Sequence, residues 1–183
     1  AVKQIVDQFT HRANRRAERQ RIGAAKEQAG GKLYSRLEGL APDGFSAAGP
    51  SRMFGTVERG LKDGTIFDYM DGGGVAYLEL GFLELFHAEY DNGAGLKISF
   101  DMFLMKSPSA ARAAIADERI CPAGGLPLDF ASPGRAFRFP PDYFMYFVSN
   151  DRLVYLHIND DLESGTLDRF ARKIKLVVDK EGT

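Results

Sequence analysis

Two segments with alternating side-chain character flank a glycine-containing turn, and this pattern constrains the fold of the chain more than any other feature. The turn is Asp91-Asn92-Gly93-Ala94-Gly95. The alternating positions, all but one of them apolar, are Glu84, Phe86, Ala88 and Tyr90 before it and Ile98, Phe100, Met102 and Leu104 after it. A period of two is typical of β-strands, because successive side chains point to opposite faces. We therefore predict an antiparallel hairpin over residues 83–105.

A second hairpin is predicted over residues 143–158. Its two strands, 143–148 and 153–158, flank Ser149-Asn150-Asp151-Arg152 and are rich in aromatic and β-branched residues. Such composition favours strands that are buried on both faces.

Helices are expected between and after the hairpins. Ser107 and Pro108 are typical of an N-cap and a first helical residue, and Ala111, Ala114 and Ile115 would form the buried side of that helix. A final helix is predicted to begin near Thr166, with an apolar stripe of Leu167, Phe170, Ile174 and Val177. Hairpins that alternate with helices indicate the α+β class, an antiparallel sheet with helices packed on it.

The first part of the chain has a different character. Val2, Ile5, Val6, Phe9 and Ala13 follow helical spacing, and this predicts a long helix over residues 2–29 that Gly30-Gly31 ends. Residues 41–65 contain seven glycines and prolines and are expected to form loops and short strands. The 183-residue chain is thus predicted to consist of a basic helical arm, residues 1–40, and a single α+β domain, residues 41–183.

Charge is unevenly distributed between these parts. The chain has 24 Lys and Arg against 25 Asp and Glu, but residues 1–32 hold eight bases and three acids, which leaves 16 bases and 22 acids for the remainder. A net charge of −1 argues against a dedicated nucleic-acid binder. Arg12, Arg15, Arg16 and Arg19 would share one face of the predicted helix, as candidates to bind a protein partner, a neighbouring copy or an anionic surface. A plain solvated face is the alternative.

Catalytic and metal-binding signatures are not evident in the sequence. The single Cys121 excludes an internal disulfide and any cysteine-based zinc cluster, and no serine lies in a Gly-x-Ser-x-Gly motif. Of the three histidines, His11 lies in the arm, while His87 and His157 lie in different hairpins and would meet only if their strands were neighbours. No apolar run is long enough to span a membrane. We predict no metal site and no cofactor.

Residues 67–90 carry a resemblance to a known family. The matching residues are Phe67-x-Tyr69-Met70-Asp71-Gly72-Gly73-Gly74-x-x-Tyr77-Leu78-x-x-Gly81-Phe82 and Ala88-Glu89-Tyr90, with Asp101-Met102 and Ser107-Pro108 downstream. They resemble a family of uncharacterised, often exported bacterial proteins with an aromatic-x-Tyr-(Ile/Met)-(Asn/Asp)-Gly-Gly-(Ala/Gly) motif. The similarity covers roughly residues 50–178, and Gly74 and Val75 depart from the usual alanine and acidic residue. It implies a periplasmic or secreted protein, which a first residue Ala1 also suits.

The same segment supplies the candidate ligand-binding residues. Successive glycines can form a concave nest of backbone N–H groups, so Asp71, Gly72, Gly73, Gly74 and Tyr77 are candidates to contact a ligand. The alternative is that the glycines permit close packing or divide one helix into two. Among the carboxylates Asp68, Asp71, Glu79, Glu84, Glu89 and Asp101, only Asp101 lies between apolar neighbours in a predicted strand.

These observations favour a non-catalytic extracytoplasmic binding or assembly module. In this hypothesis the N-terminal helix docks on a partner or on a neighbouring copy. The alternative is a small-molecule-binding domain or hydrolase with a pocket beside Asp71–Gly74.

Overall fold

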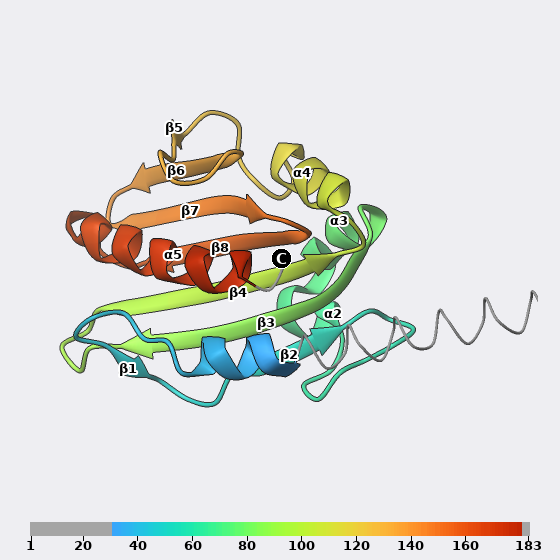
Figure 1. Ribbon diagram of the computed structural model, residues 1–183, viewed down its shortest axis with the longest axis horizontal. Helices are drawn as coiled ribbons and strands as arrows, with labels where there is room; N and C mark the ends of the chain where they lie inside the picture. The colour runs from blue at the N-terminus through green and yellow to red at the C-terminus, as the bar shows by residue number, and fades with distance from the viewer. Residues whose placement is uncertain (1–30, 181–183) are drawn as a thin grey trace, which may run out of the picture.

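The structure, a computed structural model, describes residues 31–180 and is built on one antiparallel sheet (Figure 1). The predicted helix over 2–29, His11 and the four arginines of the arm lie outside the described residues. Eight strands form the sheet in the order β1-β3-β4-β8-β7-β6-β5, and β2 also pairs with β3. They are β1 (Ser46–Ala47), β2 (Arg52–Gly55), β3 (Phe82–Asp91), β4 (Lys97–Met105), β5 (Leu126–Pro127), β6 (Gly134–Phe139), β7 (Asp142–Ser149) and β8 (Arg152–Ile158).

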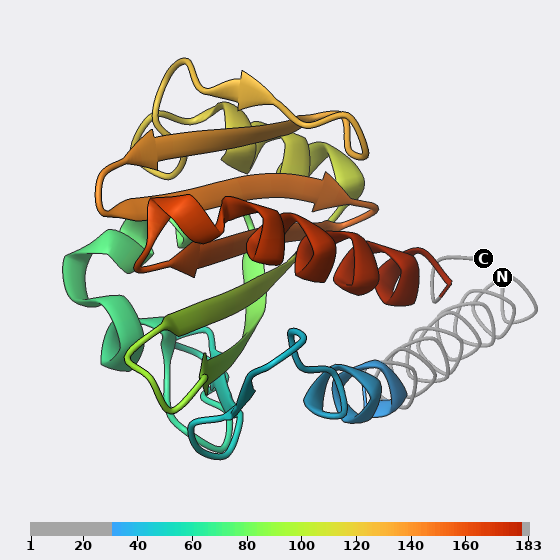
Figure 2. The same ribbon diagram turned by 90° about the vertical axis from the view of Figure 1, so that its left-hand side faces the viewer.

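Helices cover the sheet from both sides (Figure 2). A helix over residues 31–38 and α5 (Ser164–Asp179) pack on one face, with the short η2 (Asp161–Glu163) leading into α5. On the other face lie α2 (Ile66–Met70), η1 (Asp71–Gly73), α3 (Gly74–Glu79) and α4 (Pro108–Ala116). The predicted α+β class with two hairpins is confirmed. No helix within residues 31–180 combines the length and hydropathy that crossing a membrane requires.

The core between the sheet and α5 follows the alternation in the sequence. Phe86, Ala88, Tyr90, Ile98, Phe100 and Met102 are all buried there. The ring of Phe100 lies 5.5 Å from that of Phe86 and 6.1 Å from that of Phe170 on α5. The apolar stripe of α5 is therefore seated on the sheet as its spacing predicts.

Residues 31–38 differ from the expectation that Gly30-Gly31 ends a helix. They are helical, so Gly31 lies within a helix, whereas the predicted helix over 2–29 and its end lie outside the described residues. Leu33 and Leu37 lie one turn apart and are fully buried in the core that α5 covers, and the ring of Tyr34 stacks on Phe86 at 5.6 Å. Burial of two leucines outweighs the roughly 1 kcal/mol that a glycine costs in a helix.

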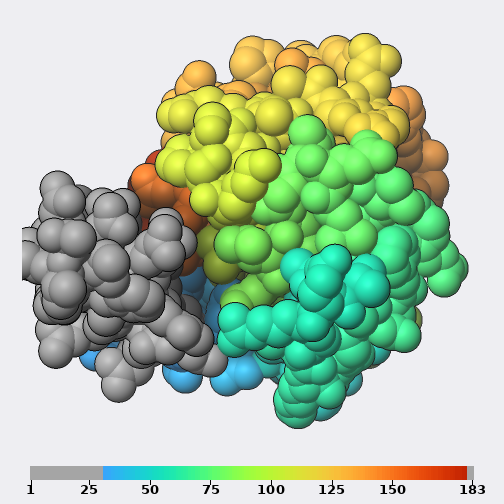
Figure 3. Space-filling view, turned by 90° about the vertical axis from the view of Figure 1, so that its right-hand side faces the viewer, coloured from blue at the N-terminus to red at the C-terminus, as the bar shows by residue number. Residues whose placement is uncertain are grey.

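The opposite core forms where α2, α3 and α4 cover the sheet, and Figure 3 shows α3 (green) and α4 (yellow) as adjoining parts of that surface. Ser107 caps α4 as predicted, since its hydroxyl accepts from the Ala110 N–H at 3.1 Å. Ala111, Ala114 and Ile115 are buried, which confirms the predicted inner side of this helix.

On this face the cover is incomplete, and the prediction that the second hairpin is buried on both faces is wrong. Leu153 and Val148 lie under the helices and are buried. Farther along the same face, the side chains of Phe144, Tyr146 and Tyr155 are only partly buried. The aromatic composition of these strands therefore reflects a partly covered surface at the edge of this core.

Candidate functional site

A row of polar and aromatic side chains crosses the sheet at the margin of the helical cover. Residues directly opposite each other on neighbouring antiparallel strands place their side chains on the same face. The strand register aligns six such residues from β2 to β6: Arg52, His87, Asp101, Tyr155, Tyr146 and Arg135. This face is the one that α2, α3 and α4 partly cover.

At the centre of the row, the buried His87 and Asp101 form a hydrogen-bonded trio with the partly buried Tyr69 of α2. Asp101 is 4% exposed and His87 is 6% exposed. The Asp101 Oδ1 atom lies 2.7 Å from His87 Nδ1. The Tyr69 hydroxyl lies 2.9 Å from Oδ1 and 2.8 Å from Oδ2, so the carboxylate accepts its single proton, and it also lies 3.1 Å from His87 Nδ1. These hydrogen bonds to the Asp101 carboxylate are charge-assisted, and they satisfy a group that would otherwise be costly to bury.

Helix α2 brings Tyr69 onto the sheet. Thr65 and Asp68 form a capping box at its start, and Asp71, with a φ of 47°, ends it in the left-handed region. The ring of Tyr69 consequently lies 5.2 Å from that of Phe54 and 4.9 Å from that of His87. The short helix thus positions one hydroxyl over the Asp101 carboxylate.

His87 is the sole cationic partner that Asp101 has within residues 31–180. Its Nδ1 is the nitrogen that faces Asp101, while Nε2 lies 3.8 Å from Glu89 Oε1. A histidine balances the Asp101 charge only when it is protonated. With neutral His87, the carboxylate keeps a net negative charge beneath the surface.

Three further tyrosines surround this carboxylate, and together with Tyr69 we call them the tyrosine cluster: Tyr69, Tyr77, Tyr146 and Tyr155. The rings of Tyr146 and Tyr155 lie 4.8 Å apart, and that of Tyr77 stacks on Phe103 at 4.3 Å. Tyr155 is the direct cross-strand neighbour of Asp101.

The hydroxyls of Tyr77, Tyr146 and Tyr155 have no hydrogen-bond partner among the described residues. All fully buried side-chain nitrogen and oxygen atoms in that part of the chain do have one. The three hydroxyls must therefore reach solvent, although the rings that carry them are largely buried. Burial is the main cause that raises the pKa of Tyr69 and Tyr155, and the negative charge of Asp101 raises it further. The four phenols consequently stay protonated at neutral pH and can donate hydrogen bonds.

Alkaline titration should report this environment directly. Burial raises the pKa of Tyr155 from 10.0 to about 12. Because the folded-state pKa lies above the unfolded one, this contribution to stability is complete below pH about 10 and is lost as the pH rises through about 12. We expect the phenolate absorbance of the native protein to rise later than that of the guanidinium-unfolded chain, and Tyr155→Phe to remove one late-titrating phenol. Coincident native and unfolded curves would contradict the burial of these groups.

Aromatic side chains continue the surface beyond the cluster. The rings of Phe137 and Phe139 on β6 both stack on the ring of Phe144 on β7, at 5.1 and 5.8 Å, and Phe139 is 59% exposed. His157 Nε2 lies 2.7 Å from Asp142 Oδ1 on the same face. The uncovered half of the sheet is therefore an aromatic platform with carboxylates at its edge.

The glycine turn that the sequence singled out lies apart from the trio. Asp71, Gly72 and Gly73 form the exposed η1 between α2 and α3, so one helical stretch is divided into two. A Cβ at Gly74 would lie 3.0 Å from Ile66 Cγ2, which explains a glycine there by close packing. The Gly74 N–H is used within the turn, toward Asp71 and Gly72 carbonyls. Of the five candidates, Tyr77 belongs to the tyrosine cluster, and a ligand on the turn itself stays a prediction.

The histidines and the cysteine do not come together. His87 lies on β3 and His157 on β8, with β4 between them. Cys121 is buried, and burial raises the pKa of its thiol. Within residues 31–180 no three His, Cys, Asp or Glu side chains are grouped so that they could hold a metal ion.

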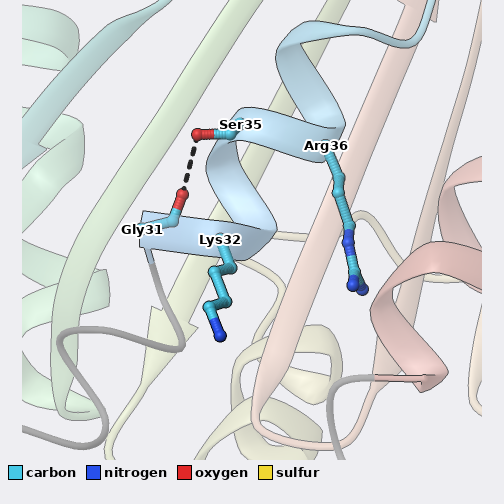
Figure 4. Close-up of a pocket in the computed structure, with 4 residues that line it drawn as sticks. All are labelled: Gly31, Lys32, Ser35 and Arg36. Carbon is cyan, nitrogen blue, oxygen red and sulfur yellow. Dashed lines mark hydrogen bonds between the residues drawn. The ribbon is translucent and has the colours of Figure 1, made fainter.

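A separate hollow lies on the helix over residues 31–38 (Figure 4). Gly31, Lys32, Ser35 and Arg36 line it, and the Ser35 hydroxyl donates to the Gly31 carbonyl at 3.0 Å. This helix packs on the sheet face opposite the tyrosine cluster, so the hollow is no part of the site.

Comparisons with known proteins add little to this geometry. No family model matches the chain, and no curated protein matches it. Membership of the uncharacterised family therefore stays a prediction. Among solved structures, the extracellular domain of PknH from Mycobacterium tuberculosis is similar, with a TM-score of 0.45 and 11% identity over 81% of this chain and 91% of that chain. Similarity this low carries no argument about function.

Sequence reasoning noticed Asp101 but missed its partners. A signal for His87 was present, because the turn at 91–97 sets a register in which residues 87 and 101 are opposite. The turn at 149–152 likewise pairs Tyr146 with Tyr155. No sequence signal places β4 beside β8 or Tyr69 over Asp101, since both depend on how distant elements pack.

Proposed function

We propose that this protein is a non-catalytic extracytoplasmic binding module that holds a small ligand on the tyrosine cluster. One observation carries the proposal: the hydroxyls of Tyr77, Tyr146 and Tyr155 have no partner among the described residues and lie around a buried carboxylate at the end of the helical cover. Rings that are mostly buried with free polar tips are typical of binding surfaces, because a ligand can cover the ring and complete the hydrogen bonds.

Binding suits these side chains better than catalysis. A general base or nucleophile acts best when its pKa is near the working pH. Burial instead raises the pKa of Tyr69 and Tyr155, and Nδ1 of His87 is engaged by Asp101. The site thus offers protonated phenols and ring surfaces.

The test is a screen of cationic, anionic and neutral small molecules by ligand-observed NMR against the full chain. We expect at least one compound to bind wild type and to lose binding in Tyr155→Leu. Tyr143→Leu is the matched control, because Tyr143 lies on the neighbouring strand β7 but in the core under α5. Absence of any binder, or a binder that is indifferent to Tyr155→Leu, would refute the proposal.

The location and the arm belong to the same proposal. An extracytoplasmic location is supported by the resemblance of residues 67–90 to an often exported family, and fractionation of the producing cell tests it. The arm is supported by the charge split, with an excess of five bases in residues 1–32 and of six acids in the remainder. We infer that the arm docks on a protein partner or on a neighbouring copy.

Charge reversal in the arm should abolish this docking. Substitution of Arg12, Arg15, Arg16 and Arg19 together by glutamate reverses the attraction, whereas the same four changes to lysine keep the charge. If copies associate, we expect light scattering at low salt to show a smaller species for the glutamate variant and an unchanged one for the lysine variant. Equal masses for wild type and both variants would show that copies do not associate through the arm, and docking on a different protein would then be the remaining case. If wild type and both variants captured such a protein equally well, the docking role of the arm would be refuted.

A further inference from the structure

We propose that the ligand of the tyrosine cluster is a small organic cation with an alkylated ammonium group. It would lie against the rings of Tyr146 and Tyr155, on the side of Asp101. This inference rests on the proposed function and names the class of its ligand. Three arguments support it. The first is the charge balance at the trio, the second is the presence of ring surfaces beside it, and the third is that other classes of ligand fit these two features less well.

The carboxylate of Asp101 is the first step. A buried carboxylate is normally paired with a cation. Within residues 31–180 no lysine or arginine nitrogen makes an ion pair with Asp101, and its partners are the Tyr69 hydroxyl and His87 Nδ1. Unless His87 is protonated, the negative charge is not neutralised inside the protein. A cation at the surface above it would complete the pair.

The charges at the ends of the row do not cancel this field. Arg52 is two strands from Asp101 and Arg135 is three strands away. At about 4.8 Å per strand these separations are about 10 and 14 Å, comparable with or beyond the Debye length of about 8 Å at physiological salt. The guanidinium of Arg52 lies over the ring of Phe54 at 4.6 Å. The exposed carboxylate of Glu89, 3.8 Å from His87 Nε2, adds to the negative potential.

The rings supply the second step. Tyr146 and Tyr155 are inclined to each other by 40°, and the ring of Phe144 lies 6.2 and 6.1 Å from them. Aromatic faces carry partial negative charge and attract alkylated ammonium groups within about 6 Å of the ring centre. The Asp101 charge contributes to the raised pKa of Tyr77, Tyr146 and Tyr155, which places all three phenols in its field.

Other ligand classes fit less well. An anion would meet Asp101 and Glu89 and would be repelled. A metal ion needs several oxygen or nitrogen ligands, and no such group of three occurs among the described residues. A neutral apolar molecule could stack on the rings but would leave the Asp101 carboxylate without a cation to balance its charge. An alkylated ammonium uses both the rings and the charge.

The experiment compares choline with 3,3-dimethyl-1-butanol, its uncharged isostere, on the full wild-type chain. We expect choline to shift the tyrosine ring resonances in NMR titrations and to bind at least about tenfold more tightly than the isostere, the equivalent of one tenfold step in Kd. Choline affinity should fall as salt is raised, because screening weakens its attraction to the carboxylate. Equal binding of the two compounds, or no salt dependence, would overturn the inference without any variant.

Two substitutions then locate the interaction. Asp101→Asn should weaken choline binding about tenfold and leave the isostere unchanged. Asp43→Asn is the control, because Asp43 is exposed and pairs with Lys173 of α5 on the opposite face, and it should change neither affinity appreciably. Tyr155→Leu should abolish choline binding, and Tyr143→Leu should preserve it. Choline binding that is unaffected by Asp101→Asn would overturn the inference. If choline does not bind but a neutral or anionic compound binds in a way that requires Tyr155, the inference of a cationic ligand is overturned and the binding module is upheld. If no compound binds, the binding module itself is refuted.

Discussion

Replacement of Phe100 by alanine is expected to lower the free energy of unfolding by about 3–5 kcal/mol, the range for a large aromatic removed from a packed core. Phe100 is fully buried on the central strand β4. Its ring contacts Phe86 on β3 and Phe170 on α5, so the cavity would open between the sheet and its longest helix. Because β4 is hydrogen-bonded to β3 on one side and to β8 on the other, these strands cannot move to fill that cavity.

Equilibrium unfolding in urea, followed by far-ultraviolet circular dichroism, measures this effect. Phe139→Ala is the matched control, because Phe139 is 59% exposed and its truncation should cost less than about 1 kcal/mol. A Phe100→Ala protein that unfolds at the wild-type urea concentration would show that the helix α5 is not seated on this ring.

The second large effect is expected from Asp101→Ala, which should destabilise the protein by about 3 kcal/mol. The substitution removes the acceptor that the Tyr69 hydroxyl and His87 Nδ1 share, and it leaves these two groups, 3.1 Å apart, only each other as partners. Loss of a partner from a buried polar group costs roughly 1–3 kcal/mol. Both donors lie within 2.9 Å of Asp101 oxygens in the folded protein. The loss therefore comes from hydrogen bonds and not from packing volume.

A double-mutant cycle separates these contributions. Tyr69→Phe removes one donor, so its combination with Asp101→Ala should cost less than the sum of the two single changes by about 1 kcal/mol or more. Asp142→Ala serves as the control, since its contact with His157 is largely at the surface and should contribute about 1 kcal/mol at most. Strict additivity between positions 69 and 101 would show that the trio is not a coupled unit.

The fold could be predicted from the sequence where the interactions are local. The alternation from Phe86 to Tyr90 and the turn after Asp91 define one hairpin, and the structure confirms its strands and its buried face. The Ser107 cap and the stripe of α5 were equally evident, because a cap and a 3.6-residue period depend on neighbours in the chain.

What could not be predicted depends on contacts between distant elements. The strand β6, Gly134–Phe139, was missed because its short alternation carries two arginines and no hairpin signal precedes it. The helix over residues 31–38 was missed because only burial of Leu33 and Leu37 against the sheet outweighs its glycine. The half-covered face was missed because aromatic strands look alike whether a helix covers them or not. The tyrosine cluster falls in this last group.

The helix over residues 31–38 and the tyrosine cluster occupy opposite faces of one sheet. The first described residues of the chain therefore lie on the sheet face opposite the phenols. A partner bound to this helix and a ligand bound to the phenols, as we propose, would therefore lie on opposite faces of the sheet. Strand β4 belongs to both faces, because its adjacent residues Phe100 and Asp101 point toward α5 and toward the tyrosines, respectively.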